Sequence, residues 1–185
     1  TIVTCVQPGE LKAALSLFKQ PPTLTIVDSQ IFPYVAKVLP ENSPLTSFSI
    51  LFARFKGDLP QLVQGIKTVE QLKPHNQIAV LEGCTHHPTE NDVGRVQIPD
   101  FLEEKAKGKL RFQYFQGKDF PDKFTADLLV FCGSCMLSRR EVLARLAIAK
   151  AQQLPAVNYG ILLAYKSGIL ARALAPMGIK LSNII

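Results

Sequence analysis

Three cysteines and one histidine lie in two short clusters, and each cluster directly follows an apolar run. Cys84 and His86 follow the first of these runs, and Cys132 and Cys135 follow the second. Thiolates that converge at the ends of buried strands bind soft metal centres such as zinc or an iron–sulfur cluster. The sequence therefore predicts a metal site whose ligands are these four residues.

The spacing of the second cluster favours a shared metal centre, because a C-x-x-C segment can bind one centre from a single loop. Ser138 and Glu141 follow as an S-x-x-E capping box, so we expect a helix to begin directly after Cys135, with its partial positive charge near the thiolates. Structural zinc takes four Cys or His ligands, whereas an iron–sulfur cluster usually takes four thiolates, of which only three are present. Spacing alone leaves zinc, iron–sulfur and plain buried cysteines open.

The remaining histidines and the fourth cysteine are weaker candidates. His86 and His87 are adjacent and point in different directions in an extended chain, so His86, two residues from Cys84, is the better ligand. The alternative for His86 is a loop histidine that hydrogen-bonds a ligand. We expect His75 to be exposed in a junction and Cys5 to be buried in a strand.

The composition is that of an ordinary globular chain. The 185 residues are 47% hydrophobic and 19% charged, with a net charge of +6. Lysines and arginines are scattered without interleaved aromatic residues, so we expect no nucleic-acid partner. We expect no membrane association either, because no apolar stretch reaches the roughly 20 residues of a span and no signal peptide is visible.

Four cysteines in a chain of this size do not resemble a secreted disulfide framework, so we expect a reducing cytoplasm. The sequence does not begin with Met, and we interpret it as a fragment or a processed product.

Apolar strand patterns alternate with amphipathic helix patterns and predict an α/β fold of two small parallel-sheet domains built from βα repeats. We expect the domains to meet near Lys73, and the first domain to leave a sheet edge unpaired that suits association with a second copy. The expected strands are 2–6, 24–27, 46–54, 77–81, 110–115, 128–131 and 156–159, and the expected helices are 8–18, 29–39, 62–69, 98–108, 138–153 and 161–174.

In an open parallel sheet, ligands bind at the carboxyl ends of the strands. Cys84 and Cys132 each come directly after a predicted strand, and residues 158–160 end a third. We therefore expect these three segments to line one edge of the second domain.

Four segments together resemble the HydF family of FeFe-hydrogenase maturation scaffolds, and the resemblance covers the whole chain. They are residues 45–58, 84–88, 132–141 and 158–160. The resemblance implies a 4Fe-4S cluster in place of zinc. It also implies that residues 1–73 are a dimerisation domain and residues 74–185 an iron–sulfur cluster-binding domain.

The resemblance further implies a role as carrier. A diiron precursor bearing CO, cyanide and a dithiolate bridge, built by radical enzymes, is carried on a homodimer and handed to the apo FeFe-hydrogenase. The family's GTPase phosphate loop, G-x-x-x-x-G-K-[ST], does not occur here. We therefore predict no GTP hydrolysis by this chain and regard it as a scaffold and not as an enzyme.

One position departs from the family pattern, in which a histidine precedes the C-x-x-C segment. Phe131 occupies that place and cannot bind iron. The fourth ligand is left open among His86, a carboxylate from residues 90–92, and water, and such a site suits exchange. The alternatives to a scaffold are a structural zinc-binding interaction module and a metal-dependent lyase or hydrolase.

Overall fold

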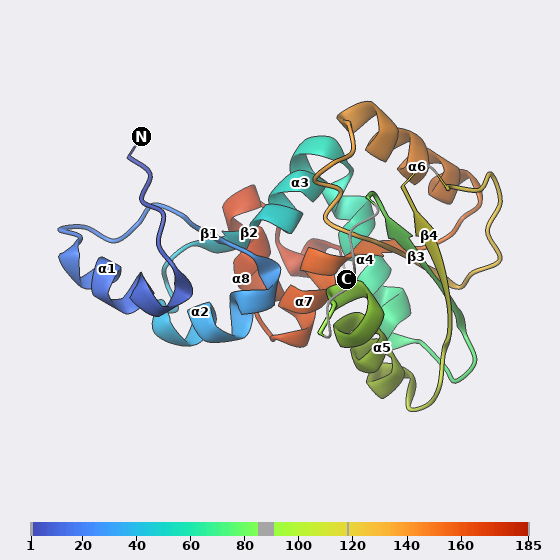
Figure 1. Cartoon of the computed structure of the whole chain (residues 1–185), viewed down its shortest axis with the longest axis horizontal. Coiled ribbons are helices and arrows are strands. Elements are labelled where there is room, and N and C mark those ends of the chain that lie inside the picture. Colours follow the sequence, from blue (N-terminus) through green and yellow to red (C-terminus); the bar gives the residue numbers. More distant parts are fainter. Residues whose placement is uncertain (1, 85–90, 118, 185) are drawn as a thin grey trace.

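The computed structural model describes residues 2–84, 91–117 and 119–184 and has an α/β fold with two small parallel sheets, as predicted (Figure 1). The strands are β1 (Thr25–Val27), β2 (Leu45–Ser47), β3 (Gln77–Glu82), β4 (Arg111–Gln116), β5 (Leu128–Phe131) and β6 (Ala156–Asn158). The helices are α1 (Leu11–Leu17), α2 (Phe32–Val38), α3 (Phe48–Lys56), α4 (Leu59–Glu70), α5 (Ile98–Ala106), α6 (Arg139–Ala151), α7 (Tyr159–Lys166) and α8 (Leu170–Leu174), with a π-helical turn at Val93–Gln97 before α5.

The larger sheet has the strand order β4-β3-β5-β6, and all of its strands are parallel. Its two central strands are buried along almost their whole length, as expected for a parallel sheet covered on both faces. Helices α4, α5 and α7 contact one another beside one face, while α6 lies on the opposite side of the strands in Figure 1.

The connections of this sheet reverse direction at its centre. β3 leads through α5 to β4 on one side, and β5 leads through α6 to β6 on the other. The carboxyl ends of β3 and β5 therefore form a topological switch point, where open α/β sheets bind their ligands.

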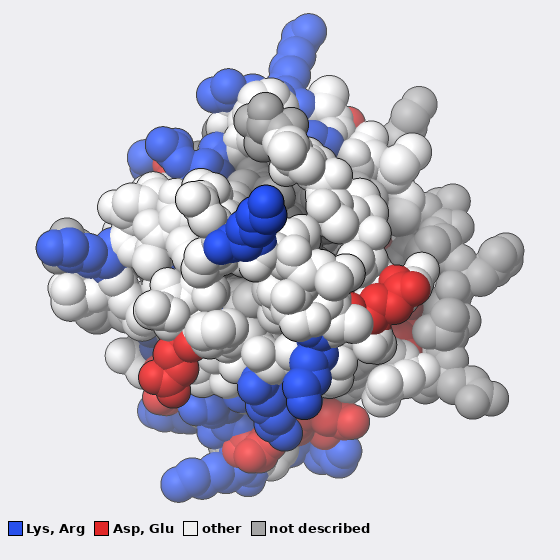
Figure 2. Space-filling view, turned by 90° about the vertical axis from the view of Figure 1, so that its left-hand side faces the viewer, with Lys and Arg blue, Asp and Glu red and all other residues white. Residues whose placement is uncertain are grey.

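The smaller sheet pairs β1 with β2 and belongs to the N-terminal part of the chain, at the left of Figure 1. β2 is wholly buried and packs against α8, where the Thr46 hydroxyl donates a hydrogen bond to the Ala173 carbonyl oxygen at 2.9 Å. β1 is less covered. Figure 2 shows this end of the molecule, where the centre of the face carries few charged side chains.

Several exposed apolar side chains belong to the first 34 residues. They are Ile2, Val3, Val6, Leu17, Phe18, Ile26 and Tyr34. Exposed apolar side chains are typical of a surface that another protein covers where they form one contiguous patch.

One of the predicted strands is wrong, and another is too long. Residues 2–7 have no regular structure, and Cys5 is exposed, so its expected burial is also wrong. The predicted strand 46–54 ends at Ser47, whose hydroxyl accepts a hydrogen bond from the Ile50 N–H at 3.3 Å and caps α3. Ile50 and Ala53, three residues apart, are the buried residues of this helix.

The other predicted strands, and the helices within a few residues of their ends, are confirmed, except that the helix 161–174 is divided. α7 ends before Gly168, whose positive φ of 69° turns the chain into α8. The predicted domain boundary near Lys73 stays a prediction. α4 precedes it and packs against β6 of the larger sheet. None of the described helices is long and apolar enough to span a bilayer.

Candidate metal centre

Three strands of the larger sheet end together at one edge. The strand register places Leu81 opposite Phe131, and Phe131 opposite Asn158. Cys132 directly follows β5, and its N–H donates a hydrogen bond to the Leu81 carbonyl oxygen at 3.0 Å. Cys84 comes two residues after β3. The predicted gathering of these segments at one sheet edge is therefore confirmed, and it lies at the switch point between β3 and β5.

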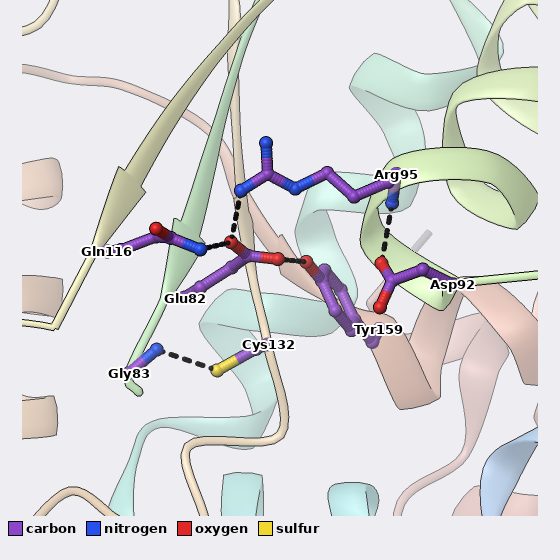
Figure 3. Close-up of polar contacts among 7 residues, drawn as sticks. All are labelled: Glu82, Gly83, Asp92, Arg95, Gln116, Cys132 and Tyr159. Carbon is purple, nitrogen blue, oxygen red and sulfur yellow. Dashed lines mark hydrogen bonds and ion pairs between the residues drawn. The ribbon is translucent and has the colours of Figure 1, made fainter. Parts of the chain in front are cut away.

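Backbone N–H groups from both strand ends point at the Cys132 sulfur. Gly83 donates to Cys132 Sγ at 3.1 Å and Ser134 at 3.3 Å, and Figure 3 shows the first of these contacts. Burial raises the pKa of the Cys132 thiol, and these two hydrogen bonds act in the opposite direction because they favour the thiolate. Negative charge on Cys84 and Cys135 raises the pKa further.

The C-x-x-C loop is short and tightly turned. Ser134 adopts a left-handed conformation with φ of 55°, and Cys135 is exposed where Cys132 is partly buried. The predicted helix start is confirmed, since the Ser138 hydroxyl accepts a hydrogen bond from the Glu141 N–H at 3.3 Å. The N-terminus of α6, with its partial positive charge, therefore follows directly after the loop.

A buried polar network lies beside Cys132 and was not predicted from the sequence. Glu82, the last residue of β3, is only 1% exposed. Its carboxylate binds Arg95 Nη2 at 2.7 Å and Gln116 Nε2 at 3.0 Å, and it accepts a hydrogen bond from the Tyr159 hydroxyl at 3.5 Å (Figure 3). The Arg95 guanidinium also stacks on the Tyr114 ring, 3.7 Å from its centroid. A glutamate at the end of an apolar strand is the one sequence signal that could have indicated this network.

Asp92 ties the start of the π-helical turn to the same network. Its carboxylate accepts a hydrogen bond from the backbone N–H of Arg95 at 2.9 Å, while the side chain of Arg95 binds Glu82 of β3. Arg95 therefore joins this turn to β3. Burial, together with the negative charge of Glu82, raises the pKa of Tyr159 far above its ordinary value. The Tyr159 hydroxyl therefore remains a donor to Glu82.

Not every predicted site residue belongs to the part of the chain that the structure describes. His86 and His87 lie outside it, because residues 85–90 are not described. Among the described residues, no group of three or more His, Cys, Asp or Glu side chains is arranged to hold a metal ion. The ligand set Cys84, Cys132, Cys135 and His86 therefore stays a prediction. His75 is exposed, as predicted.

The residue types of the predicted ligand set suit a thiolate-bound metal centre. Cys84, Cys132 and Cys135 bring soft sulfur donors to one sheet edge, which suits an iron–sulfur cluster or zinc and does not suit hard cations such as Mg²⁺. Phe131 is 3% exposed and packs in the core, so it adds nothing to the donor set.

The comparisons with known proteins agree with the motifs. No match was found among curated proteins. The model of the hydrogen maturase F tetramerization domain matches residues 60–176, which include the three cysteines of the candidate centre, and the model of the hydrogen maturase F dimerization domain matches residues 1–57. The chain therefore belongs to the hydrogen maturase F (HydF) family.

Proposed function

We propose that this hydrogenase-maturation protein holds a 4Fe-4S cluster at the switch point of its larger sheet and carries a diiron precursor there. The observation that carries the proposal is the position of Cys132. It follows β5 and accepts hydrogen bonds from the N–H groups of Gly83, which directly precedes Cys84, and of Ser134, which directly precedes Cys135. Backbone N–H groups aimed at sulfur stabilise a thiolate ligand.

In this proposal Cys84, Cys132 and Cys135 supply three thiolates, and a different group completes the site. Asp92 is a poor candidate, because it is buried and its carboxylate already caps the π-helical turn. His86, Glu90 and water remain the candidates for the fourth position.

When bound, such a cluster supplies one iron with an exchangeable position to which a precursor carrying cyanide can attach. The chain's own residues hold and orient that centre: backbone N–H groups neutralise charge on Cys132, and the network around Glu82 fixes the end of β3. We assign no catalytic activity to the chain itself.

Self-association, which both family models describe, belongs to the same proposal. β2 is covered by α8, while β1 is more exposed and pairs only with β2 among the described strands. We propose that two copies join the β1 edges of their small sheets across a two-fold axis. The partners would be the radical maturation enzymes and the apo FeFe-hydrogenase in the cytoplasm.

The deciding experiment is anaerobic reconstitution of four single variants, Cys84→Ser, Cys132→Ser, Cys135→Ser and Cys5→Ser, followed by EPR and by iron, sulfide and zinc analysis. We expect the first three to lose cluster content by about tenfold or more. We expect Cys5→Ser to match the wild type, because Cys5 is exposed in the irregular N-terminal segment.

Each other result points to a definite alternative. Equal loss in all four variants would mean that the ligand assignment is wrong. Stoichiometric zinc without a 4Fe-4S signal would favour a structural zinc module, and sustained hydrolase or lyase turnover would favour a metal-dependent enzyme.

A further inference from the structure

Lys56, the last residue of α3, binds the C-x-x-C loop through three backbone carbonyl oxygens. Its Nζ donates to Ser134 O at 3.1 Å, to Cys135 O at 2.8 Å and to Leu137 O at 2.9 Å. A lysine ammonium has three N–H donors, so these contacts use all of them on one loop.

These contacts orient the peptide groups of the loop. The Ser134 carbonyl points to Lys56 while the Ser134 N–H points to Cys132 Sγ, and the left-handed φ of Ser134 makes this division possible. Left-handed conformations are unfavourable for residues other than glycine and persist only where surrounding contacts hold them. Lys56 supplies such contacts through the Ser134, Cys135 and Leu137 carbonyl oxygens.

The loop also has little space in which to relax toward α3. The cavity between them has a volume of about 10 Å³, with Phe52 and Ala53 of α3 on one side and Phe131, Cys132 and Gly133 on the other. That volume holds at most one water molecule. Ser49, near the start of α3, accepts a hydrogen bond from the Gly160 N–H at 3.2 Å, so α3 contacts two of the segments at this sheet edge.

We propose that Lys56 is a positioning residue that fixes the backbone of the C-x-x-C loop at the end of β5, where the proposed cluster would bind. The inference rests on the proposed cluster at this loop. Lys56 lies in the segment matched by the dimerization domain, and the loop lies in the segment matched by the tetramerization domain. The contacts of Lys56 therefore join the loop of the proposed metal centre to α3, a helix from the other matched segment.

The first test uses the metal-free full chain. Lys56→Met keeps a similar length but removes the charge and all three donors. After brief alkylation with iodoacetamide, mass spectrometry gives the rate for each cysteine, with the exposed Cys5 as internal reference. We expect Cys132 in Lys56→Met to react about tenfold faster relative to Cys5 than in the wild type, because the loop no longer shields it.

Arg54→Met is the matched control, because Arg54 is an exposed cation on the same helix. It should leave the Cys132 rate within twofold of the wild type. Lys56→Arg should give an intermediate rate, because its charge remains but its planar fork cannot serve three converging carbonyls from one nitrogen. Circular dichroism confirms folding, and Lys56→Gln replaces the Met variant if that one does not fold.

The second measurement is iron release to a chelator after anaerobic reconstitution, which we expect to be about tenfold faster in Lys56→Met. A wild-type rate of alkylation in Lys56→Met, or an equal change in Arg54→Met, would overturn the proposal. Faster alkylation without faster iron release would overturn the role of Lys56 in the metal site. Failure of the wild type to bind iron would refute the proposed cluster, and the alkylation result would still decide whether Lys56 orders the loop.

Discussion

Glu82 places a carboxylate inside the larger sheet, and partners from three other segments make this possible. Arg95 provides the countercharge to the Glu82 carboxylate, and Gln116 and Tyr159 donate further hydrogen bonds to it. A buried ion is costly unless it is paired, so removal of one partner costs more than the pair itself contributes.

We expect Arg95→Met to lower the free energy of unfolding by about 3 kcal/mol, because it leaves the buried Glu82 carboxylate without its countercharge. Urea unfolding followed by circular dichroism measures this loss. Arg111→Met, at an exposed arginine on β4, is the control and should change stability by less than about 0.5 kcal/mol. Equal effects of the two substitutions would contradict the importance of the pair.

Tyr159 should be silent in an alkaline titration of the native protein. Its folded pKa is raised above the ordinary value of about 10, so the stability that it contributes is complete below that pH and falls as the pH rises further. In absorbance at 295 nm, Tyr159→Phe should leave the native titration amplitude unchanged and reduce the amplitude that appears only on alkaline unfolding. A smaller native amplitude in the variant would show that Tyr159 ionises in the folded protein.

The sequence predicted the sheet edge at which the cysteines lie, but it did not predict the side chains that surround them. The C-x-x-C spacing and the apolar runs place Cys84 and Cys132 at the ends of strands, because strand ends can be read from local pattern. Lys56 and Arg95 carry no comparable signal. They act through contacts with residues that are distant in the sequence, and a single lysine or arginine on a helix is usually a solvated surface charge.

At the scale of elements, α4 owes its position to a glycine. A Cβ on Gly65 would lie 2.1 Å from the Ala156 carbonyl oxygen of β6, so the helix and the strand are in backbone contact there. We expect Gly65→Ala to separate α4 from β6 and to cost about 3 kcal/mol of stability in urea unfolding. Gly9→Ala, where nothing lies within 4 Å of the added Cβ, is the control and should be close to neutral. A neutral Gly65→Ala would mean that this contact is looser than the structure indicates.

The predicted elements were most reliable where both the period and the capping residue were clear. Residues 46–54 were predicted as a strand because Phe, Ile and Leu are frequent there. Ser47 instead caps a helix whose buried residues are Ile50 and Ala53. A short apolar run suits a buried strand and a buried helix equally, so its neighbours decide between them. The apolar run 2–6 was also predicted as a strand, but it has no pairing partner among the described strands and forms no regular structure.

At the scale of the molecule, the exposed apolar residues of the N-terminal part predict self-association. We expect light scattering to give a mass of at least twice the 20.4 kDa of one chain. Ile26→Lys, on the β1 strand, should favour the monomer because it places a charge on the proposed joined edge. Leu143→Lys, at a similarly exposed leucine on α6, should leave the dimer intact. A monomeric wild type at micromolar concentration would contradict the edge-pairing proposal.

The sequence by itself determined the α/β class, most of the elements, and the two cysteine clusters that follow β3 and β5, because each of these depends on local patterns of apolar and capping residues. Only the tertiary structure decided that β3 and β5 are neighbours at a switch point, that Lys56 clamps the loop between Cys132 and α6, and that Glu82 is paired inside the sheet. These features depend on side chains that are far apart in the chain and meet only when the sheet and its helices have packed together.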